Sequence, residues 1–327
     1  MARYHLLSQY IWPDGAPTAI YAEHLAERLR SRGAAVVLAG GTGVYREAAR
    51  PRPQVTLEHL PHFVGRRGSG ASVIREYLSV ERAFRRYIRE RVGSGDVVVV
   101  TSAPPNSVRL AREIERRGAA SVYWLQDYYP ELVRGVFDPP APMRRVLARW
   151  FDGLLARWTR VVKIGGNLGY EGRNAIVIRN WPTVSFPEDV APVPKTALYS
   201  GNLGYAQKVS ALVEICEELR GEGYTITIRG DGPGMAKLPV WIDRAAPLKS
   251  RDELVRSYLQ AETHLVAAHP EIQRAVFPSK LWNSLAAGRR IRCAGFAGVM
   301  QTELEASLAA PYREHLHLWD SLLRGLE

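Results

Sequence analysis

The sequence predicts an α/β protein made of two successive Rossmann-like domains, each with a parallel sheet covered by helices. Strand and helix patterns alternate over residues 4–180, stop in a proline-rich segment over residues 181–196, and then begin again. Such alternation is typical of parallel sheets, whose strands need crossover connections. We therefore expect one domain over residues 1–180, a linker over 181–196 and a second domain over 197–327, with the two parallel sheets facing each other across a cleft.

The first half opens with a strand over residues 4–8, a loop that contains Gly15, a helix over 18–31 and a strand over 35–39. This order, with a glycine in the loop, is typical of the doubly wound class. Glycine lets the backbone come close to a bound group, so Gly15 is a candidate diphosphate contact, although a plain turn explains it equally well. Further patterns of this half cover residues 72–92, 97–101, 107–117, 121–125, 143–155, 161–164 and 176–178.

Asp127 follows the apolar strand over residues 121–125 and stands in the loop at its carboxyl end. A carboxylate at this place is a candidate acceptor-side group and proton relay. A carboxylate that only caps the next turn is at least as common.

The second half has strand patterns over residues 197–200, 225–229, 239–242 and 264–267, and helix patterns over 208–219 and 252–259. Glycine-rich turns follow the first two strands, and their sequences are Gly201-Asn202-Leu203-Gly204 and Gly230-Asp231-Gly232-Pro233. The second turn is a candidate to shape a nucleoside pocket, or it only ends a strand. Arg244, after the strand predicted at 239–242, is a candidate to stack on a base.

The stretch over residues 269–296 organises this half. Pro278, Ser279 and Lys280 precede apolar residues at helical spacing, and Gly288 closes a predicted helix of about ten residues. A loop that opens onto a helix N-terminus gathers N–H groups and partial positive charge, which together hold an anion such as a diphosphate. Lys280 is therefore a candidate ligand for that anion, and a solvated lysine at an ordinary helix start is the alternative.

The composition is that of a globular protein, with 46% hydrophobic and 24% charged residues among 327. No apolar run approaches the ~18 residues of a membrane helix, and the first residues lack a signal-peptide core, so we expect a cytoplasmic protein. Two cysteines provide neither a disulfide framework nor a metal cluster. His5, His264 and His269 lack metal-ligand spacing, so we expect no metal site.

The positive charge lies in the first half. Residues 1–180 carry 28 Lys and Arg against 16 Asp and Glu, a net charge of +12, whereas residues 181–327 carry 16 against 17, a net charge of −1. The first half should therefore face an anionic partner: a phospholipid surface, a lipid-linked diphosphate or a nucleic acid. No aromatic–basic motif supports nucleic acid, and genome composition is a further explanation of the arginine content.

The helix predicted over residues 72–92 carries basic residues along one face. They are Arg75, Arg82, Arg86 and Arg89, and Arg66 and Arg67 precede them in the loop. Basic residues near an anionic leaflet contribute roughly 1 kcal/mol each, so this face predicts reversible docking on the inner surface of the cytoplasmic membrane. A core-packed helix with a solvated basic face is the alternative.

Seven short motifs stand in a fixed order along the chain: Leu7-Ser8-Gln9-Tyr10, Thr101-Ser102-Ala103-Pro104-Pro105, Gln126-Asp127-Tyr128-Tyr129-Pro130-Glu131, Arg179-Asn180-Trp181, Tyr199-Ser200-Gly201-Asn202-Leu203-Gly204, Gly230-Asp231-Gly232-Pro233 and Pro278-Ser279-Lys280-Leu281. In this order the chain resembles the retaining GT-B glycosyltransferases. It is most similar to family 4 members that build bacterial surface polysaccharide and lipid-linked oligosaccharide.

The resemblance implies that the N-terminal domain binds the acceptor and that the C-terminal domain binds the nucleotide-sugar. It also implies a last helix, over about residues 311–325, that crosses back to the N-terminal domain. The expected reaction is sugar transfer with retention, without a cofactor or an obligatory metal, from a UDP-sugar rather than a GDP-sugar. Many relatives use lipid-linked acceptors. Such chemistry needs positive charge and N–H groups on the departing diphosphate more than a nucleophile.

The resemblance also places family residues on positions of this chain. The basic pair that binds the diphosphate falls on Asn202 and Lys208, so only the lysine is kept. The glutamate pair falls on Ala275 and Asn283, and we expect Asn283 to hydrogen-bond the nucleotide ribose. Gln126 stands where a histidine is common.

Two alternatives to a transferase stay open, and the loss of both glutamates favours the first. One is a non-catalytic GT-B subunit or nucleotide-sugar-binding protein. The other is a different GT-B enzyme, a nucleotide-sugar 2-epimerase or a phosphorylase, and an epimerase would need acid–base carboxylates and histidines that the sequence does not place.

Overall fold

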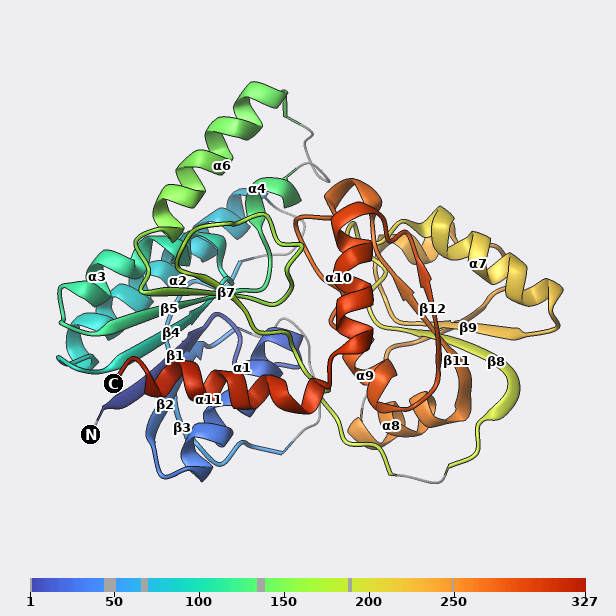
Figure 1. Cartoon of the computed structure of the whole chain (residues 1–327), viewed down its shortest axis with the longest axis horizontal. Coiled ribbons are helices and arrows are strands. Elements are labelled where there is room, and N and C mark those ends of the chain that lie inside the picture. Colours follow the sequence, from blue (N-terminus) through green and yellow to red (C-terminus); the bar gives the residue numbers. More distant parts are fainter. Residues whose placement is uncertain (1, 44–50, 66–69, 134–138, 188–189, 249) are drawn as a thin grey trace.

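Two parallel sheets form the frame of the protein, and Figure 1 shows them side by side in two lobes with helices around each. The computed structural model describes residues 2–43, 51–65, 70–133, 139–187, 190–248 and 250–327. Arg66 and Arg67, expected beside the basic helix, lie outside these residues. The predicted α/β fold with two parallel sheets is confirmed, and the residue limits of the two domains stay a prediction.

The first sheet has seven strands in the order β3-β2-β1-β4-β5-β6-β7, and every neighbouring pair is parallel. Central strands such as β4 (Val97–Thr101) are apolar runs buried along their whole length, because helices cover both faces of the sheet. Strand β3 (Thr56–Leu60) was not predicted, since this half-exposed edge strand has a weak apolar pattern. The other strands are β1 (Arg3–Ser8), β2 (Ala35–Gly41), β5 (Ala120–Leu125), β6 (Arg160–Lys163) and β7 (Ala175–Val177).

The helices of the first lobe follow the predicted alternation with two differences, and the first is α4 (Tyr129–Leu132), which lies in a segment predicted as a loop. The second is that the helix expected over residues 107–117 is a 3-10 helix, η1 (Pro105–Leu110), followed by the short α3 (Ala111–Glu115). Tighter 3-10 turns are common at helix starts, and the 3.6-residue period on which the prediction depended does not distinguish a short 3-10 helix from an α-helix. The remaining helices are α1 (Pro17–Ser31), α2 (Gly70–Arg91) and α6 (Ala141–Leu155).

The second sheet has five parallel strands in the order β10-β9-β8-β11-β12. The strand expected over residues 239–242 is wrong, because Ile242 N–H closes a turn on the Pro239 carbonyl and β10 begins only at Asp243. The strands are β8 (Val193–Ser200), β9 (Thr225–Arg229), β10 (Asp243–Ala245), β11 (Ala261–Ala267) and β12 (Arg290–Ala294). The α-helices are α7 (Val209–Gly221), α8 (Arg251–Gln260), α9 (Lys280–Ala286) and α10 (Gly298–Ala309).

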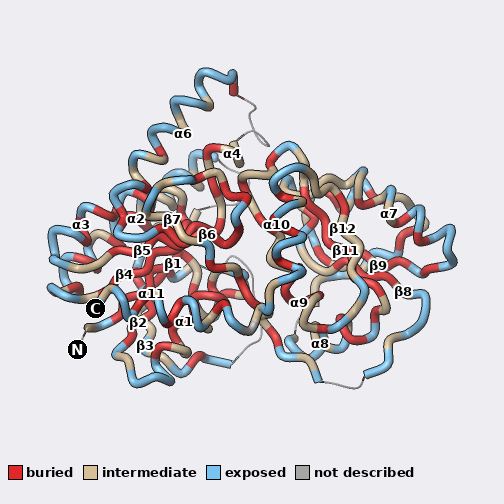
Figure 2. The backbone as a smooth tube through the Cα atoms, viewed as in Figure 1, coloured by how far each residue is buried: buried red, intermediate tan, exposed pale blue. Residues whose placement is uncertain are grey.

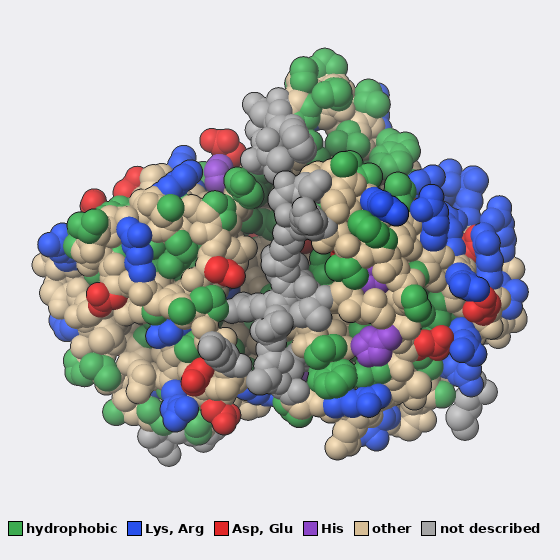
Figure 3. All heavy atoms as spheres, turned by 180° about the vertical axis from the view of Figure 1, so that it is seen from behind, with side chains coloured by type: hydrophobic (Ala, Val, Ile, Leu, Met, Phe, Trp, Pro, Cys, Tyr) green, Lys and Arg blue, Asp and Glu red, His purple; other side chains and the backbone are tan. Residues whose placement is uncertain are grey.

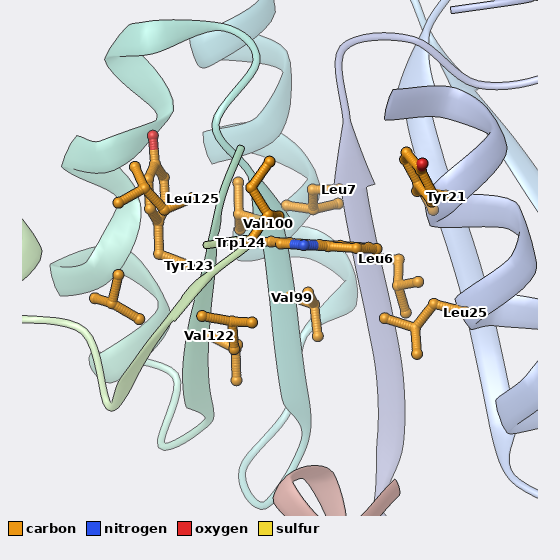
Figure 4. Packing of buried hydrophobic residues seen from close by; sticks show 14 of the residues in the cluster. Leu6, Leu7, Tyr21, Leu25, Val99, Val100, Val122, Tyr123, Trp124 and Leu125 are labelled. Atoms are coloured by element: carbon orange, nitrogen blue, oxygen red, sulfur yellow. The ribbon is translucent and has the colours of Figure 1, made fainter. Parts of the chain in front are cut away.

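The last helix, α11 (His315–Arg324), lies across the first lobe. Its Trp319 is fully buried, 4.7 Å from the Trp124 ring of β5, and Trp181 stacks on Trp124 at 5.8 Å. Figure 4 shows the Trp124 ring extending from β5 towards Leu6 of β1, and Figure 2 shows the buried residues concentrated in the two sheets. The chain therefore starts in the first lobe, crosses to the second and returns.

The carboxyl edges of the two sheets meet through main-chain hydrogen bonds. Tyr128 N–H, after β5, donates to the Ala275 carbonyl at 2.7 Å, and Gly169 N–H, after β6, donates to the Arg274 carbonyl at 3.0 Å. Glu303 of α10 accepts from Gly166 N–H at 2.8 Å and pairs with Arg179 at 2.5 Å. Because ligands of parallel sheets bind at carboxyl edges, this contact locates the region in which a site should lie.

Trp319→Ala is expected to lower the free energy of unfolding by about 3–5 kcal/mol, since it leaves a cavity beside Trp124. Urea denaturation followed by circular dichroism measures the change. Leu318→Ala is the matched control, because this neighbour on α11 is 47% exposed and should change stability by less than about 0.5 kcal/mol. Equal effects of the two changes would contradict the anchoring of α11 through Trp319.

Candidate active site

Two glycine turns lie against each other at the carboxyl edge of the second sheet. Gly201 N–H donates to the Arg229 carbonyl at 2.8 Å, and Leu203 N–H donates to the Asp231 carbonyl at 2.8 Å. A Cβ on Gly230 would stand 2.1 Å from the Gly201 oxygen, so no other residue fits there without moving the backbone. Both turns were predicted, and the structure brings them together with Gly232, whose Cβ would stand 2.2 Å from Asn202 Oδ1.

The ammonium group of Lys280 is held beside the first of these turns. Its Nζ donates to the Asn202 carbonyl at 2.8 Å and to the Tyr199 hydroxyl at 2.5 Å, and it lies 4.2 Å from the centre of the Tyr199 ring. A Cβ on Gly201 would stand 2.4 Å from Lys280 Cε. The glycine at 201 therefore makes room for the lysine, and a positive charge is fixed at the strand end.

The helix that carries Lys280 is shorter than predicted. Helix α9 spans seven residues instead of about ten, because Ala287 already forms its C-cap and Gly288 adopts a left-handed φ of +64°. Within the described part of the chain, Ser279 forms no side-chain capping bond. The N-terminal amides of so short a helix supply less partial positive charge than the sequence suggested, so the ammonium of Lys280 is the stronger anion-binding group.

Lys208 lies at the same edge of the sheet. It is the N-cap residue of α7, and its N–H donates to the carbonyl of Ala268, which follows β11. Pro278 and Ser279 immediately precede α9, and Asn202 and Asp231 are exposed on the two turns. These predicted residues therefore share one edge of the second sheet.

Two residues that were predicted to contact the nucleotide bind other groups of the protein in the structure. The amide oxygen of Asn283 accepts from Thr183 N–H at 2.8 Å, and its amide nitrogen donates to the Thr183 hydroxyl at 3.0 Å. Arg244 donates to the Leu238 carbonyl. The ribose contact of Asn283 and the base contact of Arg244 stay predictions. A ribose hydroxyl would have to replace Thr183, which sequence reasoning did not identify because it lies 100 residues away along the chain.

In the first lobe, Gln126 and Asp127 lie at the end of β5, where the two sheets meet. The N–H groups of both donate to Ser102 Oγ, at 3.1 and 3.2 Å, so this serine fixes the turn. Gln126 is buried, and its Nε2 has no hydrogen-bond partner among the described residues. Burial also raises the pKa of Asp127 to about 6. A carboxyl group with this pKa can exchange a proton near neutral pH, as a relay must.

Gly15 stands two residues before α1, in the first lobe. Asp14 Oδ1 accepts from Ala16 N–H at 2.7 Å, which shapes the loop around this glycine. The contact of Gly15 with a diphosphate stays a prediction.

The predicted structural histidines are engaged in the fold. His5 contacts Tyr87 and Asp96 at 2.8 and 3.1 Å, and His264 contacts the Tyr258 carbonyl at 2.8 Å. His269 accepts from Glu271 N–H. In the described ranges of the chain, no group of three or more His, Cys, Asp or Glu residues is arranged to hold a metal ion.

Sequence comparison connects the chain to one curated protein, and no family model matches it. It is 30% identical over 270 residues to the "Putative colanic acid biosynthesis glycosyl transferase WcaI" of Escherichia coli (strain K12). The alignment covers 73% of this chain and 63% of that protein, so the chain spans less than two thirds of the curated relative's length.

Structure comparison finds similar folds at low sequence identity. The α,α-trehalose-phosphate synthase (UDP-forming) of Burkholderia xenovorans, in complex with glucose-6-phosphate, has a TM-score of 0.58 and 11% identity, with 100% of this chain and 97% of that chain covered. The pneumococcal O-GlcNAc transferase GtfA, in complex with UDP and GlcNAc, has a TM-score of 0.54 and 10% identity, with 99% of each chain covered. The chain therefore has the GT-B fold, and the resemblance to GT-B glycosyltransferases that its motifs suggested is confirmed.

Proposed function

We propose that this protein transfers a sugar from a UDP-sugar to an acceptor, with retention at the anomeric carbon and without an obligatory metal ion. The observation that carries the proposal is the fixed ammonium of Lys280 beside the glycine turns of the second sheet. The complex of GtfA with UDP supports a uridine nucleotide. The similarity to WcaI supports a role in the biosynthesis of a surface polysaccharide.

In the proposed reaction, the bond between the anomeric carbon and the β-phosphate oxygen breaks, and the acceptor oxygen bonds to the same face of that carbon. The diphosphate leaves with additional negative charge. The ammonium groups of Lys280 and Lys208 stabilise this charge. Lys280 exchanges a bond to the Asn202 carbonyl for one to a phosphate oxygen, so its charge is already in place when the reaction begins.

The acceptor proton passes to the departing diphosphate, and Asp127 acts as the relay. Two features support this role. Asp127 lies next to Tyr128, whose N–H is bonded to Ala275, the position at which the family glutamate approaches the sugar. Its raised pKa of about 6 also favours a carboxyl group that takes up and returns a proton.

Lys280→Ala is expected to lower the rate of UDP release from a UDP-sugar by about 100- to 1,000-fold, the usual effect of removing one electrostatic donor. Its affinity for UDP, measured by calorimetry, should fall as well, because the product carries the same diphosphate. Lys237→Ala is the matched control, since this lysine is exposed in the same lobe. If Lys280→Ala binds UDP as tightly as Lys237→Ala does, the diphosphate lies elsewhere.

Asp127→Asn is expected to stabilise the protein at pH 8 and to have little effect at pH 4. The pKa of Asp127 is raised from 3.8 in the unfolded chain to about 6 in the fold, so its ionisation costs stability as the pH rises through this window. The gain at pH 8 should be about 3 kcal/mol, measured by urea denaturation at both pH values.

Glu113→Gln provides a control of opposite sign. Its hydrogen bond with Arg89 lowers the pKa of Glu113, so ionised Glu113 stabilises the fold above its unfolded-state pKa. Glu113→Gln should therefore destabilise the protein at pH 8 and much less at pH 3. An Asp127→Asn variant that loses stability at pH 8 would show that the carboxylate is stabilised in the fold and is no proton relay.

A second candidate is a nucleotide-sugar-binding protein without turnover. It is favoured by the absence of a carboxylate at both family-glutamate positions, since Ala275 is buried and Asn283 is bonded to Thr183. A thermal-shift screen across UDP- and GDP-sugars identifies the ligand by the rise in melting temperature. Incubation of that sugar with the protein and acceptor lipids then separates the candidates, because only a transferase releases UDP.

A further inference from the structure

Helix α6 projects from the first lobe and exposes an apolar face. Figure 1 shows it standing away from the body of the lobe, and Figure 3 shows hydrophobic side chains at this projection, at the top of the molecule. Met143, Val146 and Trp150 are 57%, 66% and 53% exposed. Their spacing of three and four residues puts them on one side of the helix. Apolar side chains gathered on a projecting helix indicate a binding surface.

The C-terminal half of α6 is fixed to the lobe. Phe151 and Leu155 belong to the buried core, and Asp152 accepts from the Tyr128 hydroxyl at 2.9 Å. The Phe151 ring meets that of Tyr128 edge-on at 5.8 Å. The body of the lobe covers only this part of the apolar stripe, so the exposed part is held in position by a packed base.

Basic residues border the exposed apolar face. Helix α6 contains Arg144, Arg145 and Arg149 against one acidic residue, Asp152, and Arg145 and Arg149 are exposed. The described part of the chain contains no helix long and apolar enough to cross a bilayer. A helix with an apolar face that includes Trp, bordered by arginines, is typical of segments that lie in the interface of an anionic membrane.

The arginines of α2, from which membrane docking was predicted, are partly engaged within the protein. Arg86 pairs with Glu90 at 3.0 Å, and Arg89 pairs with Glu113 of α3 at 2.9 Å. Arg75 lies over the Phe63 ring at 4.2 Å. These carboxylates offset much of the charge that α2 would present to a lipid surface.

We propose that α6 docks this protein on an anionic phospholipid surface through Met143, Val146 and Trp150, with Arg145 and Arg149 at the headgroups. A second copy of the chain fits this face less well. In a symmetric contact the same patch meets itself, which would bring the arginines of both copies together.

The position of α6 connects this surface to the candidate site. Asp152 of α6 accepts a hydrogen bond from Tyr128, and Asp127 is the residue that immediately precedes Tyr128. An acceptor carried by the lipid surface would therefore arrive beside the proposed proton relay. Docking itself does not depend on the proposed activity, and it is tested without nucleotide so that the two can fail separately.

Co-sedimentation with vesicles tests the docking surface. The protein should bind vesicles of phosphatidylglycerol and phosphatidylcholine, bind pure phosphatidylcholine weakly, and dissociate in ~1 M salt because the charges are screened. Replacing Met143, Val146 and Trp150 by Ser should lower the partition coefficient by about tenfold or more. The matched control replaces three exposed apolar residues of the other lobe by Ser, at Val240, Val299 and Leu308.

The charge is tested in the same way. Arg145→Glu with Arg149→Glu should weaken binding to anionic vesicles, whereas Arg251→Glu with Arg256→Glu, in exposed positions of α8, should not. Brominated lipids should quench part of the tryptophan fluorescence, and Trp150→Phe should remove that part while binding is retained. This variant reports the location of the contact without depending on a loss of binding.

Three results would overturn the proposal. The first is equal binding of the wild-type protein and the triple Ser variant, and the second is equal binding to anionic and zwitterionic vesicles. The third is a dimer, seen by light scattering, that becomes monomeric in the triple Ser variant. That result would assign the apolar face to a second copy of the chain.

Discussion

The main-chain contact between the carboxyl edges of the two sheets determines where every candidate group lies. Tyr128 N–H and the Ala275 carbonyl form its shortest bond, and Asp127 precedes the donor along the chain. Because main-chain atoms make this contact, the side chain at position 275 can change without loosening it. The contact between the two lobes of the GT-B fold is therefore kept with alanine at the position where the resemblance places a family glutamate.

The electrostatics of the candidate site divide between the two lobes. Lys280 fixes a positive charge at the second sheet, because the lack of a side chain at Gly201 leaves room for the side chain of Lys280. The first sheet provides a carboxyl group, Asp127, whose pKa is raised to about 6 by burial. In the proposed reaction the departing diphosphate needs the positive charge and the acceptor proton needs the carboxyl group, so mutation of each residue tests one proposed role.

Local patterns predicted most of the fold, since buried parallel strands and glycine turns leave clear signals in the sequence. They did not predict α10, which has almost no apolar period, or the early end of α9, where Ala287 already forms the C-cap. The local patterns also did not predict the contacts that define the site. Tyr199 and Lys280 are 81 residues apart, and Thr183 and Asn283 are 100 residues apart. Such pairs depend on how the strands are ordered, which spacing alone does not reveal.

The two basic helices, α2 and α6, also show that spacing along the sequence does not reveal contacts between elements. Helical spacing identified the arginines of α2 as one face, but it could not show that Glu113, from a different helix, lies against Arg89. In α6 the apolar stripe extends beyond the part that the lobe covers, so Met143, Val146 and Trp150 stay exposed beside arginines. Net charge attracts a protein to an anionic surface over a distance, whereas uncovered apolar area holds it there. Helix α6 exposes three large apolar side chains beside its arginines, whereas α2 exposes two, Ile74 and Leu78, and several of its arginines are paired within the protein.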